Sequence, residues 1–157
     1  MYPRDGGDLT PVIFMVLKSG CKERALEPTH RTANSGEGKA VVIVDDNAVV
    51  RKTVGHAFLE SGFRFFGEAE NGAEGIEVVK QVKPDLAILD LSMPVMNGLQ
   101  AAIVLRKLFP NMPIILFSLY GDGTVRAEAA RAGVDAVVSK TEDMPVLIDK
   151  ACELIQH

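Results

Sequence analysis

The chain has 157 residues, of which 47% are hydrophobic and 24% are charged, and its formal net charge is −4. This length and composition are those of one globular domain with a buried core. The acidic balance argues against a large nucleic-acid-binding surface, and no apolar run reaches the roughly 20 residues that a membrane-spanning helix needs.

The N-terminal segment, residues 1–38, differs from the rest of the chain. It contains several glycines and prolines, shows little sustained periodicity and ends in the loop-like run 34–38, which predicts a disordered or weakly ordered tail. Its short apolar run at residues 12–17 follows two aspartates and lacks the basic start and cleavage site of a secretory signal. We therefore expect a cytoplasmic protein whose structured domain spans residues 39–157.

From residue 39 onward, apolar strand-like runs alternate with helical patterns. The runs are residues 41–44, 63–69, 85–90, 113–118 and 135–140. Helical patterns follow Asn47, Gly72, Gly98 and Gly123, and the last one spans residues 143–156. Short, nearly continuous apolar runs are typical of parallel strands that are buried on both faces. The pattern predicts a doubly wound α/β fold, a five-stranded parallel sheet flanked by five helices, with the flavodoxin-like order 2-1-3-4-5.

Polar side chains follow four of these strands. Asp45 and Asp46 follow the first strand, Asp90 ends the third, Ser118 ends the fourth and Lys140 ends the fifth. Because the carboxyl ends of parallel strands share one edge, where ligands bind, we expect these side chains to lie close together.

This set of residue types suits magnesium and phosphoryl chemistry. Carboxylate oxygens are the ligands that Mg²⁺ prefers, and three crowded carboxylates need a cation. Asp90 can act as a nucleophile that forms an acyl phosphate, while Lys140 and Ser118 supply a positive charge and a hydroxyl for the phosphoryl oxygens. Each residue alone has a simpler interpretation, such as a helix cap for the aspartate pair. The five together favour a Mg²⁺-dependent phosphoryl-transfer site.

Two segments carry a family resemblance. Residues 41–47, Val-Val-Ile-Val-Asp-Asp-Asn, and residues 90–98, Asp-Leu-Ser-Met-Pro-Val-Met-Asn-Gly, resemble the signatures of bacterial response-regulator receiver domains. The resemblance extends over about three quarters of the chain. It implies that Asp90 is the phosphorylated residue. It also implies that the carboxylates of Asp45, Asp46 and Asp90 bind Mg²⁺ with the main-chain carbonyl of Ser92, and that Ser118 and Lys140 contact the phosphoryl group.

The resemblance further implies a function and partners. The chain would be a phosphorylation-dependent switch of a two-component phosphorelay, and not an enzyme beyond its own phosphorylation and dephosphorylation. A sensor histidine kinase or phosphotransfer protein would donate the phosphoryl group. The fourth helix, fifth strand and fifth helix would then contact a downstream protein. We expect no direct nucleic-acid or membrane binding, and a monomer or a weak phosphorylation-promoted dimer, either a stand-alone receiver or the N-terminal part of a longer regulator.

Several positions depart from the family pattern or vary within it. Val137 stands where the family has an aromatic switch residue, and Thr141 stands where a proline often follows the lysine, so no cis peptide is expected there. Leu119 is larger than the usual residue and would crowd Asp90. Ser92 and Tyr120 occupy positions that flank the path of the hydrolytic water, and Tyr120 either screens the phosphoryl group or points outward.

Three alternative functions remain open at this stage. A haloacid-dehalogenase-type phosphatase also uses a strand-end aspartate, but it wants a second aspartate where this chain has Ser92. A pseudo-receiver would not need the intact set of five residues. Flavin binding would need a Gly-rich phosphate loop after the first strand. On the first helix, His56 is either a phosphorylatable histidine or, as we interpret it, a surface or packing residue. Residues 51–52 either steer an acidic partner or form a solvated basic face.

Overall fold

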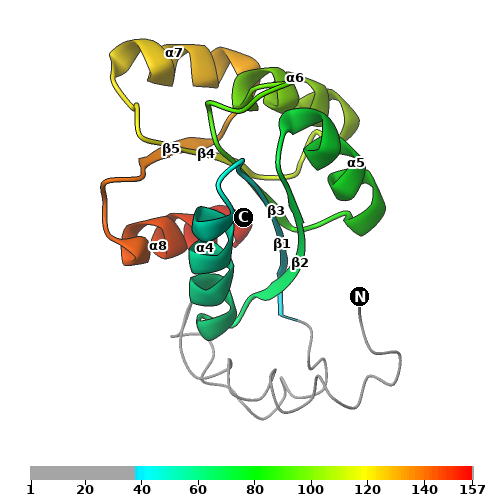
Figure 1. Cartoon of the computed structure of the whole chain (residues 1–157), viewed down its shortest axis with the longest axis vertical. Coiled ribbons are helices and arrows are strands. Elements are labelled where there is room, and N and C mark those ends of the chain that lie inside the picture. Colours follow the sequence, from blue (N-terminus) through cyan, green and yellow to red (C-terminus); the bar gives the residue numbers. More distant parts are fainter. Residues whose placement is uncertain (1–37, 157) are drawn as a thin grey trace.

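The computed structural model describes residues 38–156, where strands and helices alternate along the chain (Figure 1). In chain order the elements are β1 (Ala40–Val44), α4 (Ala48–Glu60), β2 (Arg64–Ala69), α5 (Gly72–Val82), β3 (Leu86–Leu89), α6 (Gly98–Leu108), β4 (Ile114–Ser118), α7 (Gly123–Ala132), β5 (Ala136–Ser139) and α8 (Met144–Ile155). The predicted alternation is confirmed, and each strand end lies within one residue of its expected bound.

The five strands form one parallel sheet in the order β2-β1-β3-β4-β5. The predicted doubly wound fold and strand order are therefore confirmed. The order reverses direction at β1 and β3, where Val44 pairs with Leu89. The residues that follow these two paired positions are Asp45 and Asp90, so the topology brings both carboxylates to the point where ligands bind in such sheets.

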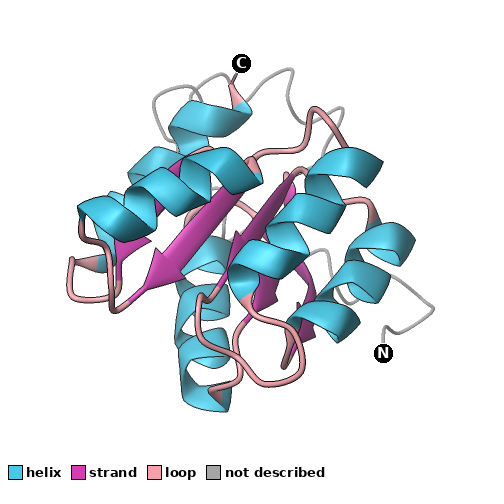
Figure 2. Ribbon diagram, turned by 90° about the horizontal axis from the view of Figure 1, so that it is seen from above, coloured by secondary structure: helices cyan, strands magenta, loops and turns pink. Residues whose placement is uncertain are grey.

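Helices cover both faces of the sheet (Figures 1 and 2). Helices α5, α6 and α7 pack against one face, and α4 and α8 against the other. Successive side chains of β1 enter opposite cores: Val42 and Val44 face the three-helix side, whereas Val41 and Ile43 face the two-helix side. Burial on both faces explains why the strands read as continuous apolar runs.

Polar residues cap the N-termini of four of the helices that follow strands. The side chains of Asn47, Asn71, Asn97 and Asp122 accept hydrogen bonds from main-chain N–H groups in the first turns of α4, α5, α6 and α7. Such caps satisfy donors that have no partner within the helix. They fix where each of these helices begins after its strand.

Two further expectations concern the N-terminal segment and membrane-spanning helices. The predicted tail, residues 1–38, lies outside the described residues apart from Gly38. Within residues 38–156, none of the helices combines the length and the apolar character needed to cross a bilayer.

Candidate functional site

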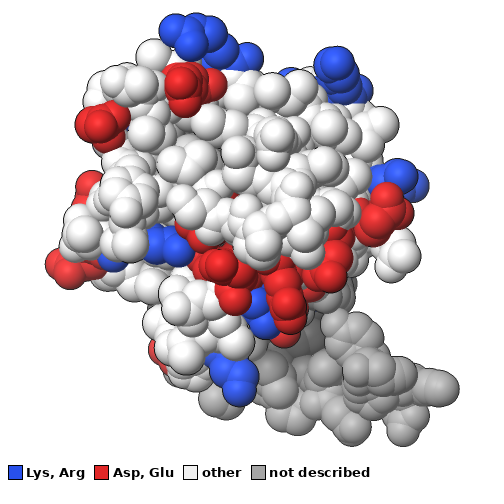
Figure 3. Space-filling model, turned by 45° about the horizontal axis from the view of Figure 1, so that its top comes forward, with Lys and Arg blue, Asp and Glu red and all other residues white. Residues whose placement is uncertain are grey.

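The site begins with a cluster of three aspartates at the carboxyl edge of the sheet. One carboxylate oxygen each from Asp45, Asp46 and Asp90 lies within 4.8 Å of the other two. Asp45 and Asp90 are 2% and 6% exposed, whereas Asp46 is exposed. One face of the molecule also carries a compact group of acidic side chains (Figure 3). The prediction that the strand topology brings these three aspartates together is confirmed.

Lys140 supplies the positive charge of the cluster. Its Nζ lies 2.7 Å from Asp45 Oδ2 and 3.1 Å from Asp90 Oδ1. Burial by itself lowers the pKa of Lys140. The hydrogen bond and charge of Asp45, together with Asp90, outweigh that effect and place the pKa above its usual value. The lysine is therefore charged at neutral pH, and it bridges the two buried carboxylates.

The pKa of Asp90 is raised above its ordinary value of 3.8. Burial is the largest cause and the negative charge of Asp45 the next, while the charge and hydrogen bond of Lys140 act in the opposite direction. A carboxylate that is buried next to another negative charge binds a proton more tightly than a solvated carboxylate does. Groups whose pKa values are shifted in this way gather at functional sites.

The main chain around the aspartates is tightly held. The N–H of Asp45 donates to Ala69 O (3.0 Å) and that of Asp90 to Val44 O (2.9 Å), so both residues continue the hydrogen-bonding of the sheet. Gly98 starts α6 against the carbonyl of Asp90, so closely that a Cβ there would overlap that oxygen. The glycine at the end of the 90–98 motif is thus required by a close approach of two backbone segments.

The two serines that were predicted at the site, Ser118 and Ser92, differ in burial. The Ser118 hydroxyl is buried and accepts a hydrogen bond from the Tyr120 N–H (3.0 Å). Ser92 lies exposed in the loop after Asp90. The side chains of Leu119 and Tyr120 are each 60% exposed, which favours the outward orientation of Tyr120.

Two residues near Lys140, Thr141 and Val137, depart from the family pattern. Every described peptide bond is trans, as predicted for a chain with Thr141 after the lysine. The Ser139 and Thr141 hydroxyls lie 2.7 Å apart, and Ser139 Oγ accepts the Thr141 N–H (3.1 Å), which closes the turn. Val137 is half-buried and packs against the three-helix side of the sheet.

The sequence interpretation missed the role of Arg51. It was expected on a solvated helix face, but its side chain is only 12% exposed and donates to the Asp45 carbonyl (2.7 Å) and the Glu68 carboxylate (2.8 Å). The sequence shows that residue 51 is basic and lies five positions after Asp46. It does not show which oxygens accept the hydrogen bonds of the guanidinium group. His56 is exposed and pairs with Glu60 at 2.6 Å, which confirms the surface interpretation.

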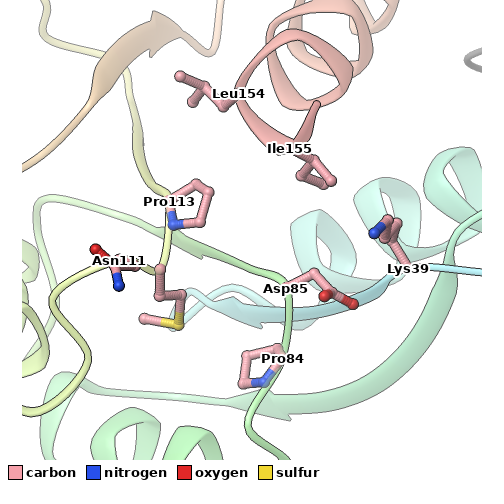
Figure 4. Close-up of a pocket in the computed structure, with 8 residues that line it drawn as sticks. Lys39, Pro84, Asp85, Asn111, Pro113, Leu154 and Ile155 are labelled. Carbon is pink, nitrogen blue, oxygen red and sulfur yellow. The ribbon is translucent and has the colours of Figure 1, made fainter. Parts of the chain in front are cut away.

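A pocket of about 270 Å³ lies at the other edge of the sheet (Figure 4). Its lining includes Lys39, Asp85 and Pro113, which precede β1, β3 and β4, and Ile155 at the end of α8. The Asp85 carboxylate accepts the N–H of Ala40 (2.8 Å) and thereby joins the starts of two strands. This pocket is therefore separate from the aspartate cluster.

Comparison with known proteins agrees with this geometry. Residues 41–151 match the response regulator receiver domain family. The chain belongs to this family. The receiver of this chain is similar to the chemotaxis protein CheY of Thermotoga maritima, at 39% identity over 66% of this chain and 86% of that protein. It is also similar to the chemotaxis protein CheY of Bacillus subtilis, at 32% identity over 73% of this chain and 92% of that protein.

Solved receivers have the same fold. The signal receiver domain of the putative response regulator NarL from Mycobacterium tuberculosis gives a TM-score of 0.72 at 27% identity, covering 76% of this chain and 98% of that one. In longer relatives the match covers only part of the protein. It covers 52% of a putative transcriptional regulator from Pseudomonas aeruginosa and 30% of a protein-glutamate methylesterase/protein-glutamine glutaminase from Hahella chejuensis.

Family membership settles the class of function. The chain is a phosphorylation-dependent signalling switch with an acidic site formed by Asp45, Asp46 and Asp90. The match of residues 41–151 to the receiver family favours a receiver over the haloacid-dehalogenase-type alternative for this domain.

Proposed function

We propose that Asp90 accepts a phosphoryl group in a Mg²⁺-dependent reaction. The observation that carries this proposal is the convergence of three carboxylates and Lys140 at one sheet edge. An Asp90 carboxylate oxygen attacks the phosphorus of a phosphohistidine, an O–P bond forms, and the N–P bond to the departing imidazole breaks. The product is an acyl phosphate on Asp90.

The residues around Asp90 have separate parts in this step. Asp45, Asp46 and Asp90 would hold Mg²⁺ with the main-chain carbonyl of Ser92, because hard oxygen donors suit this ion. When bound, the ion supplies charge that offsets the carboxylates and the phosphoryl oxygens. Lys140 and the hydroxyl of Ser118 would donate to the remaining phosphoryl oxygens. The raised pKa of Asp90 supports its assignment as the nucleophile.

Phosphate uptake tests the proposal directly. Full-length protein incubated with acetyl phosphate and Mg²⁺ should gain the mass of one phosphate, and a chelator should prevent the gain. The Asp90→Asn variant should gain nothing, because an amide is not a nucleophile for this reaction. If that variant is labelled as strongly as the wild type, the assignment of Asp90 is wrong.

The partners follow from the same proposal. We infer that a sensor histidine kinase or a phosphotransfer protein donates the phosphoryl group in the cytoplasm. We also infer that a downstream protein contacts α7, β5 and α8 of a monomer or of a weak phosphorylation-promoted dimer. Relatives that are longer than this chain include a putative transcriptional regulator. Phosphotransfer profiling against the kinases of the host would identify the donor.

We also propose that the receiver folds without the N-terminal segment. The family match begins at residue 41, and β1 begins at Ala40. A chain shortened to residues 38–157 should melt cooperatively, within a few degrees of the full-length protein. A loss of several kcal/mol in unfolding free energy, comparable to the total stability of many domains, would instead show that residues 12–17 pack on the receiver.

Tyr120 is proposed to slow the hydrolysis of the phosphorylated state. Hydrolysis needs a water molecule in line with the acyl phosphate, and the ring can cover that path if it turns inward after phosphorylation. The Tyr120→Ala variant should then lose its phosphate several-fold faster than the wild type, measured as the decay of the phosphorylated mass. The Tyr120→Phe variant keeps the ring and is the matched control, so it should lose its phosphate at the wild-type rate. Equal decay of wild type and Tyr120→Ala would refute the role of Tyr120.

A further inference from the structure

Arg51 joins three segments beside the aspartate cluster. It lies in the first turns of α4, and its Nη1 donates to the main-chain oxygen of Asp45 at 2.7 Å. Its Nε donates to the carboxylate of Glu68, near the end of β2, at 2.8 Å. The planar guanidinium is therefore fixed in two directions, by a carbonyl on one side and by a carboxylate on the other.

The carbonyl that Arg51 binds belongs to the peptide that links Asp45 to Asp46. The carboxylate of Asp45 has its own partners, the N–H of Asn47 (2.9 Å) and the ammonium group of Lys140 (2.7 Å). Asp46 is exposed, so its direction depends mainly on the main chain that carries it. The bond from Arg51 fixes the orientation of that peptide and hence the angle at which the Asp46 side chain leaves the backbone.

We propose that Arg51 is a positioning residue of the metal site, acting on the ligands Asp45 and Asp46 through the peptide between them. This inference rests on the proposed function. Mg²⁺ demands nearly ideal octahedral geometry, so a ligand that wanders from its place binds it poorly. Partners that hold metal ligands in place are typically worth 10- to 100-fold in metal affinity.

Electrostatics alone makes the opposite prediction for this residue. Arg51 is a cation bonded to the main chain of a metal ligand, so its removal should strengthen the binding of another cation. Its charge is already offset by Glu68, however, at a distance of 2.8 Å. The geometric effect should therefore exceed the effect of charge, and the sign of the change in Mg²⁺ affinity distinguishes the two.

The test uses full-length protein and measures Mg²⁺ binding directly by isothermal titration calorimetry, beside the rate of phosphate uptake from phosphoramidate at a series of Mg²⁺ concentrations. Arg51→Ala should raise the half-saturating Mg²⁺ concentration about ten-fold, the lower end of the range for such partners. Its maximal rate at saturating Mg²⁺ should stay near that of the wild type. Arg51→Lys keeps the charge but loses the two-directional fork, so it should raise half-saturation by several-fold. The neighbouring exposed cation provides the control, and Lys52→Ala should stay within about two-fold because it lacks the fork geometry.

The outcomes separate this proposal from the proposed function. Half-saturation of Arg51→Lys equal to or below that of the wild type would overturn the positioning role alone. So would a lower maximal rate with unchanged half-saturation, which is what a merely structural role would produce. If Arg51→Ala does not fold by circular dichroism, Arg51→Lys decides the question. Wild-type uptake that needs neither Mg²⁺ nor Asp90 would overturn the proposed function and this inference together.

Discussion

Replacing Lys140 with alanine is expected to destabilise the metal-free protein by about 3 kcal/mol, the lower end of the cost of removing one partner from a buried ion pair. The ammonium group contacts both Asp45 and Asp90, and both carboxylates are buried. Without it, two buried negative charges face each other and the nearby Asp46. The lower end of the range applies because Asp90, whose pKa is already raised, can take up a proton and relieve part of the repulsion.

Magnesium should reverse much of this loss. A divalent cation among the three aspartates would provide the counter-charge that Lys140→Ala lacks, so Mg²⁺ should stabilise the variant more than the wild type. Urea denaturation with a chelator and with millimolar Mg²⁺ measures both effects. Lys150→Ala is a matched control, because Lys150 pairs with Glu153 on an exposed helix surface and should contribute less than about 1 kcal/mol. If Lys140→Ala is as stable as the wild type in chelator, Lys140 does not offset the carboxylate repulsion.

The second large effect is expected at Arg106. The contacts of this residue lie at the opposite end of the strands from the aspartate cluster. Its guanidinium donates to the main-chain oxygens of Gly133 (2.7 Å), Pro110 (2.6 Å) and Met112 (2.9 Å), and to the carboxylate of Asp135 (2.7 Å). These acceptors lie in the segments before β4 and before β5. One side chain on α6 therefore ties together two loops at the amino edge of the sheet.

Arg106→Ala should lower the unfolding free energy by about 3 kcal/mol, since hydrogen bonds to charged groups contribute about 1.5–3 kcal/mol each and water replaces part of them. The same Asp135 oxygen also accepts the N–H of Ile114 (2.9 Å), so the start of β4 should loosen as well. The alkyl part of Arg106 packs on Gly133, whose φ of 93° is in the left-handed region, and that contact is lost too.

Urea denaturation of Arg106→Ala, Arg106→Lys and Lys107→Ala measures this effect. The lysine variant should recover only part of the stability, because a single ammonium group cannot span the separate acceptors. Lys107 is exposed on the same helix, so its replacement should change stability by less than about 0.5 kcal/mol. A loss below 1 kcal/mol for Arg106→Ala would show that water replaces these bonds at little cost.

Several features follow from the sequence with no knowledge of the tertiary structure. The apolar runs and helical patterns are local, so the alternation of strands and helices can be recognised without coordinates. The meeting of Asp45, Asp46 and Asp90 also follows, because parallel strands place their carboxyl ends at one edge whatever the details of packing. The capping residues Asn47 and Asn97 stand at the predicted starts of helices, where local chemistry selects them.

Other features depend on segments that only the fold brings together. The sequence shows Arg51 and Arg106 as basic residues on helices, but the acceptors of their guanidinium groups lie up to 29 positions away, at Glu68 for one and at Asp135 for the other. The ammonium group of Lys140 meets Asp45 across 95 positions, but in that case the shared edge of the parallel strands predicts the contact. Periodicity reports which face of an element is apolar, whereas the direction of a long polar side chain is set by distant neighbours. The sequence thus determined the sheet and the meeting of Lys140 with the aspartates at its carboxyl edge. The tertiary structure decided the partners of Arg51 and Arg106, because those contacts join parts of the chain that no strand pattern relates.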